Sequence, residues 1–160
     1  MTNSTDTKRG VQTGVARRLK VMTILIALFL AVFGAGLTYM YLQIEGGGRF
    51  LVAFTWAIGV LCYYILYCFW NVCTQIGADN SFSIENEKSM QRMGYAGLVI
   101  SLIILIRVIV MLMISQWFLF SPFYEAGKIC LGLIFYIVCN ALGRLIHNAY
   151  ELKEDNDLTI

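Results

Sequence analysis

Residues 21–44 read VMTILIALFLAVFGAGLTYMYLQI, a run of 24 positions without a charged side chain. An α-helix rises about 1.5 Å per residue, so this run is about 36 Å long as a helix. A bilayer hydrocarbon core about 30 Å thick is crossed by roughly 20 apolar residues. The run therefore predicts a helix that spans a membrane.

Three further apolar stretches follow along the chain, at residues 50–73, 94–120 and 129–146. The composition agrees, because 59% of the residues are hydrophobic and only 14% are charged. Charged residues make up about a quarter of an ordinary soluble domain. We predict an all-α integral membrane protein, an antiparallel bundle of four transmembrane helices.

The polar parts of the chain are short. Residues 1–20 form a basic tail, residues 21–154 a single membrane domain, and residues 155–160 a C-terminal tail. Within the membrane domain, residues 74–93 form the longest polar connector, between the second and third spans. This leaves no room for a second folded domain.

Basic residues are distributed unevenly about the four predicted spans. Cytoplasmic loops of membrane proteins collect Lys and Arg. We therefore expect both termini and the 74–93 connector to be cytoplasmic. Two basic residues, Arg49 and Lys128, fall on the opposite side, against nine on this side: Lys8, Arg9, Arg17, Arg18, Lys20, Lys88, Arg92, Arg144 and Lys153.

Helical extensions are expected at the cytoplasmic ends of the third and fourth spans. Ser83 is a suitable N-cap for a helix that begins at Ile84, and Glu85 suits the positive end of that helix. Nothing in the sequence stops this helix before the third span. The fourth span should likewise continue beyond His147, whose side chain suits the negative end of a helix.

Small residues suggest how the first two spans meet. Ala27, Ala31 and Ala35 recur every four residues in the first span, and Ala53 and Ala57 begin a similar stripe in the second. Small side chains allow helices to approach closely in lipid. We expect the stripes to pack together; the alternative is that they face lipid.

Arg107 is the one charged residue in the middle of a predicted span, whereas Arg144 lies at the end of the fourth span. An ionisable side chain within a membrane indicates a functional site and requires partners. The alternative is that Arg107 extends toward the cytoplasm or only joins helices. With no acidic residue inside the predicted spans, we expect a polar cluster of Arg107 with neutral groups: Tyr63, Tyr64, Tyr67, Asn71, Tyr136 and Asn140.

The sequence offers no recognisable catalytic set. It has one histidine, His147, and five cysteines without a C-x-x-C pair. A lone histidine does not supply paired axial ligands for a haem, and the cysteine spacing does not indicate a zinc site. We predict a protein that is not an enzyme, has no cofactor or metal, and does not bind nucleic acid directly. The basic tail suits an anionic lipid surface.

Three short motifs resemble those of a bacterial family of small four-helix membrane proteins of unknown function. They are DNSFSIEN at residues 79–86, MQRMG at residues 90–94 and the ending ELKEDNDLTI at residues 151–160. This chain departs from the family pattern at Ser81, where many members have proline, and at Met93, where isoleucine is common. Such proteins are often encoded beside a Cro-like helix-turn-helix regulator.

This resemblance implies a regulatory membrane protein that binds or sequesters a cytoplasmic partner, a helix-turn-helix transcription regulator, in the bacterial cytoplasmic membrane. The alternative is a small transporter or a receptor for an apolar, lipid-like ligand that uses Arg107 and a tyrosine-lined pocket. The signal, ligand and oligomeric state are left open. The expected partner-binding surface consists of Phe82, Ser83, Glu85, Asn86, Lys88, Arg92, Asp157, Leu158, Thr159 and Ile160.

Overall fold

The computed structural model describes residues 3–44, 48–78, 80–113 and 122–158; for residues 3–11, 122 and 155–158 the description covers the backbone only. This part of the chain forms four helices. They are α1 (Asn3–Leu42), α2 (Gly48–Gly77), α3 (Ile84–Met113) and α4 (Pro122–Leu158).

Each of the four helices is long and apolar enough to cross a membrane. The apolar spans within them are Gln12–Leu42, Gly48–Gly77, Ile84–Met113 and Phe123–Glu154. The prediction of an all-helical chain with four such helices is thus confirmed for the described residues. The part of the predicted third span that follows Met113 lies outside them.

The predicted start of the third helix is also confirmed. α3 begins at Ile84, and the Ser83 hydroxyl oxygen accepts a hydrogen bond from the Asn86 backbone N–H at 3.2 Å. This bond satisfies one of the first backbone N–H groups, which have no partner within the helix. From its cap, α3 continues without a break through Arg107.

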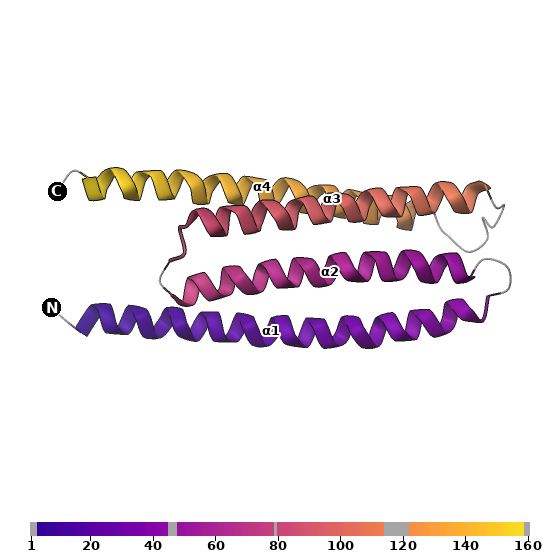
Figure 1. Cartoon of the computed structure of the whole chain (residues 1–160), viewed down its shortest axis with the longest axis horizontal. Coiled ribbons are helices and arrows are strands. Elements are labelled where there is room, and N and C mark those ends of the chain that lie inside the picture. The colour runs from indigo at the N-terminus through magenta and orange to yellow at the C-terminus, as the bar shows by residue number, and fades with distance from the viewer. Residues whose placement is uncertain (1–2, 45–47, 79, 114–121, 159–160) are drawn as a thin grey trace.

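The helices are arranged as a row in chain order (Figure 1). α3 packs most extensively against α4, followed by α1 against α2 and α2 against α3, and these pairs make nearly all of the contacts between helices. Both chain termini lie at one end of the molecule (Figure 1). We call this end of the molecule the terminal end. We call the opposite end, where α1 ends and α2 begins, the distal end.

Small residues bring α3 and α4 close together. A Cβ atom added to Gly132 of α4 would lie 3.0 Å from the Gly97 carbonyl oxygen of α3 and would clash with Ser101. The Ser101 hydroxyl lies 3.3 Å from the Ile129 carbonyl oxygen of α4, within hydrogen-bonding distance. A close crossing of this kind is favourable in lipid because backbone and side-chain atoms pack directly.

The alanine stripes of the first two spans, which were expected to pack together, do not form the contact between α1 and α2. Ala31 and Ala35 of α1, like Ala53 and Ala57 of α2, are exposed. Four residues turn a helix by about 400°, so positions spaced by four drift around it by about 40° per step. Only Ala27 stays near α2, where its carbonyl oxygen accepts a hydrogen bond from the Tyr63 hydroxyl at 2.9 Å.

Candidate functional site

Arg107 of α3 forms an ion pair with Glu125 of α4. The two side chains are only 7% and 3% exposed, so both charges are removed from the surface. Lys128 extends the cluster, with its Nζ atom 2.9 Å from Glu125 Oε1 and 4.0 Å from the centre of the Tyr124 ring. The Glu125 carboxylate therefore has a cation at each of its two oxygens.

The position at which α4 begins explains why the sequence did not indicate Glu125 as the acidic partner of Arg107. Pro122 is the first residue of α4, and proline suits the first position of a helix because its missing N–H is not needed there. Glu125 consequently lies in the first turn, where the helix N-terminus favours a negative charge. The sequence interpretation placed Glu125 in a connector, so its expectation of only neutral partners for Arg107 is wrong.

The neutral residues expected around Arg107 lie elsewhere. Tyr63 donates to the Ala27 carbonyl oxygen, and the Asn140 amide donates to the Tyr136 carbonyl oxygen at 3.0 Å. The described wall of the cavity beside Arg107 includes none of the expected cluster members Tyr63, Tyr64, Tyr67, Asn71, Tyr136 and Asn140.

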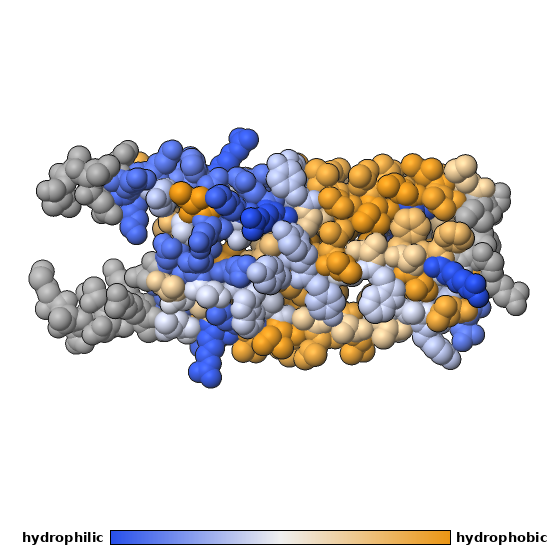
Figure 2. Space-filling view, viewed as in Figure 1, coloured by the Kyte–Doolittle hydropathy of each residue, from blue (hydrophilic) through white to orange (hydrophobic). Residues whose placement is uncertain are grey.

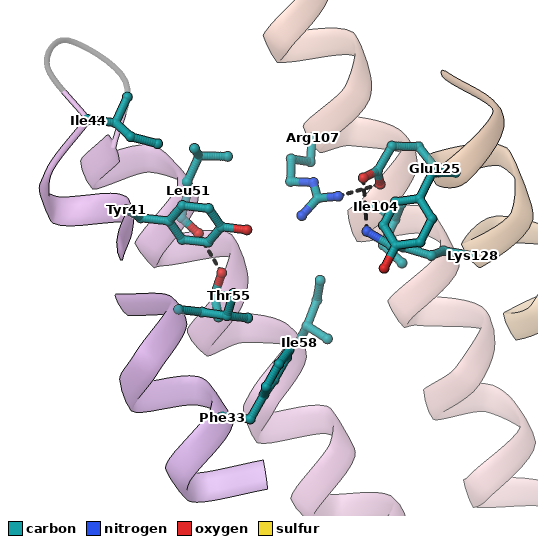
Figure 3. Close-up of a pocket in the computed structure, with 12 residues that line it drawn as sticks. Phe33, Tyr41, Ile44, Leu51, Thr55, Ile58, Ile104, Arg107, Glu125 and Lys128 are labelled. Carbon is teal, nitrogen blue, oxygen red and sulfur yellow. Dashed lines mark hydrogen bonds and ion pairs between the residues drawn. The ribbon is translucent and has the colours of Figure 1, made fainter. Parts of the chain in front are cut away.

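A cavity of about 520 Å³ lies beside the Arg107–Glu125 pair. We call it the Arg107 pocket; its volume falls within the range of about 300–1,000 Å³ that is usual for ligand sites. Figure 3 shows the guanidinium group between Glu125 and an open space bounded on its far side by Tyr41 and Thr55. The pocket is lined by Phe33, Leu37, Tyr41, Ile44, Leu51, Thr55, Ile58, Ile104, Arg107, Tyr124, Glu125 and Lys128.

The terminal end of the molecule holds a second polar region. On the face seen in Figure 2, hydrophilic residues gather toward this end, and the rest is mostly apolar. His147 of α4 connects the helices here, with Nδ1 3.0 Å from Glu87 Oε2 of α3 and Nε2 3.3 Å from Glu151 Oε1. This bridge was not predicted, because Glu87 precedes His147 by 60 positions.

A polar cleft of about 430 Å³ separates α2 and α3 near the terminal end. Within it, the Gln75 side-chain amide of α2 donates a hydrogen bond to a Glu85 carboxylate oxygen of α3. Lys88 and Arg92, one and two turns further along α3, expose their side chains. The cleft is lined by Asn71, Thr74, Gln75, Glu85, Lys88, Ser89 and Arg92.

The residues expected to bind a partner fall into three groups: exposed residues, buried residues, and residues whose side chains the structure does not describe. Phe82 is exposed, and so are the cleft residues Glu85, Lys88 and Arg92. Ser83 and Asn86 are buried, and the Asn86 amide donates to the Ser81 carbonyl oxygen at 2.8 Å, so these two residues stabilise the start of α3. The remaining residues of the expected surface lie outside the described side chains: Asp157, Leu158, Thr159 and Ile160.

Comparison with known proteins identifies a family but no function. None of the curated proteins and none of the solved structures matches this chain. The model of one protein family matches residues 16–160, which include all four apolar helices apart from the beginning of α1. The chain thus belongs to the family described as proteins of unknown function, DUF2975.

Proposed function

We propose that this chain is a non-enzymatic regulatory membrane protein that binds a soluble cytoplasmic partner at its terminal end. The observation that carries the proposal is the polar cleft between α2 and α3, where Lys88 and Arg92 expose their side chains; Phe82, just before α3, is also exposed. Exposed cations and an exposed aromatic side chain suit an acidic protein surface, because charge guides the encounter and apolar burial supplies affinity.

The proposal includes an orientation in the bacterial cytoplasmic membrane. In it, the four helices cross the bilayer as an antiparallel bundle, with both termini and the polar cleft in the cytoplasm. The nine-to-two distribution of basic residues favours this orientation. The partner that we propose is a helix-turn-helix transcription regulator, which the resemblance of the motifs at residues 79–94 and 151–160 implies.

The test is co-purification with such a regulator. Tagged membrane protein in nonionic detergent should retain the helix-turn-helix protein encoded beside its gene, and the Lys88→Glu, Arg92→Glu double variant should lose it. Arg49→Glu is the control, because Arg49 is exposed at the distal end. The proposal fails if the parent retains no regulator, or if the double variant and the control retain it equally.

The Arg107 pocket favours a second candidate function, a receptor or small transporter for a lipid-like ligand. The pocket is mostly apolar, has a few convergent polar groups and lies among all four helices. These are the properties of small-molecule sites in general. A ligand that extends the lifetime of the folded protein in detergent, and whose effect disappears in a pocket variant such as Ile58→Trp, would support this function.

A further inference from the structure

We infer that His147 forms a pH-sensitive bridge between α3 and α4, which is complete when the imidazole ring is protonated and weakened when the proton is lost. The inference is independent of the proposed function, because it concerns the contact between two helices and requires no partner or ligand. It rests on the geometry of three side chains at the terminal end: Glu87 of α3, and His147 and Glu151 of α4.

Both nitrogen atoms of the His147 ring face carboxylate oxygens. Nδ1 lies 3.0 Å from Glu87 Oε2, and Nε2 lies 3.3 Å from Glu151 Oε1. An ionised carboxylate only accepts hydrogen bonds, and a neutral imidazole has one N–H donor, whereas an imidazolium has two. The protonated ring therefore satisfies both contacts. The neutral ring leaves one nitrogen lone pair against a negatively charged oxygen.

Glu87 is the carboxylate that joins the ring to the neighbouring helix. The Gln91 side-chain amide donates to Glu87 Oε1 at 2.9 Å, which leaves Oε2 turned toward His147. The Glu87 side chain is only 17% exposed, whereas Glu151 is 63% exposed and can turn to solvent. Loss of the proton thus converts a charge-assisted bond between α3 and α4 into a neutral one, which is roughly half as strong.

The surroundings of His147 allow the ring to follow the pH of the solution. Its side chain is 46% exposed, so the ring can exchange protons with bulk water. The charged and titratable neighbours along α4, besides Glu151, are Arg144 three positions before it and Tyr150 three positions after it, and α3 contributes Glu87. The two carboxylates lie at different ring nitrogens rather than around one point, and the described residues include no group of three His, Cys, Asp or Glu that could hold a metal ion. A proton therefore suits this cluster better than a metal ion does.

The bridge lies where α3 begins. Among the polar contacts that join α3 and α4 in the described part of the chain, it is the nearest to the terminal end. Glu87 belongs to the first turn of α3, next to Glu85 and Lys88 of the polar cleft. Helix ends fray readily. A weaker bridge should therefore allow the first turn of α3, and with it one wall of the cleft, to open more often.

The experiment compares backbone hydrogen exchange in the parent and in His147→Gln, always at the same pH, with purified full-length protein in nonionic detergent. Glutamine retains a neutral amide donor but does not take up a proton. At about pH 5.5 histidine is ordinarily protonated and glutamate ionised. Residues 84–91 should then exchange about two- to fivefold faster in the variant, as expected for loss of an exposed ion pair. At about pH 8 the two proteins should exchange at the same rate, because the parent ring is neutral as well.

Further variants locate the effect. Glu87→Gln should reproduce the His147→Gln result at about pH 5.5, and the double variant should exchange no faster than either single variant, because both changes remove the same contact. Glu154→Gln removes an exposed carboxylate two turns beyond His147 on α4 and is the matched control, which should exchange like the parent at both pH values. Exchange near Ser101, further along α3, should be unchanged in every variant and reports that the helices remain folded.

Three results would overturn the inference. The same ratio of variant to parent exchange at both pH values would show that the contact does not respond to the proton. Equal exchange of the parent and His147→Gln at the acidic pH would show that no bridge forms. An equal effect of Glu154→Gln would reduce the bridge to a general effect of charge at this end. If Glu87→Gln does not fold, His147→Gln and Glu154→Gln, which change exposed side chains, still decide.

Discussion

Arg107 and Glu125, 18 positions apart in the chain, form an ion pair between α3 and α4 in which both side chains are almost fully buried. The pair lies on the same two helices as the close contact of Gly97 with Gly132. α3 and α4 are therefore joined by both a charge pair and direct backbone contact. This explains how a helix that contains an arginine can be accommodated in a membrane: the charge has a partner on the neighbouring helix.

Removing one member of the ion pair should destabilise the protein. Glu125→Leu should reduce stability by about 3–5 kcal/mol, because it leaves the buried Arg107 charge without this carboxylate. Arg107→Leu should cost less, because Lys128 still pairs with Glu125. The double variant should recover much of that loss. Thermal unfolding in detergent measures the effect. Independent, additive effects of the two substitutions would contradict the coupling.

Gly132→Ala should weaken the packing of α3 on α4. The added methyl group would meet Ser101 and the Gly97 carbonyl oxygen, and overpacking of this kind costs about 1–3 kcal/mol. Gly127→Ala is the matched control on α4, since nothing lies within 4 Å of its added Cβ atom. The measurement is the unfolding temperature of both variants; equal values would argue against a tight crossing at Gly132.

Ser83→Ala should fray the beginning of α3. Loss of the hydroxyl acceptor for the Asn86 N–H costs about 1 kcal/mol for a typical N-cap. Backbone hydrogen exchange at the first turn of α3 should become faster, whereas exchange near Ser101 should not change. Ser83→Thr retains the acceptor and serves as the control. Unchanged protection at Asn86 in the alanine variant would show that the cap contributes nothing.

Cysteine labelling in whole cells tests the proposed orientation. In a background without the five native cysteines, Phe123→Cys should react with a reagent that does not cross membranes, and Ser81→Cys should not. Phe123 is suitable because it is 88% exposed at the distal end of α4, whereas Glu125 beside it is buried. Reaction at position 81 but not at 123 would reverse the proposed topology.

The sequence by itself determined the features that depend on neighbouring residues. Four apolar runs predict four long helices, because the length of a run compared with the bilayer thickness is a local property. The start of α3 was also predictable, since the Ser83 cap bonds to Asn86 only three positions further along. The same reasoning did not anticipate that Pro122 begins α4, and Glu125 was consequently left outside the predicted spans.

Only the tertiary structure decided which faces of the helices meet. A helix in lipid is apolar all around, so hydropathy does not indicate the side that contacts a neighbour. For this reason the alanine stripe of α1 looked like an interface, while the true close contact joins Gly97 and Gly132. The partner of Arg107 was not predictable for the same reason. Glu125 contacts the guanidinium group only because α4 packs on α3. The relative rotation of α3 and α4, which no local pattern encodes, thus created the ion pair, and the packing of all four helices created the pocket beside it.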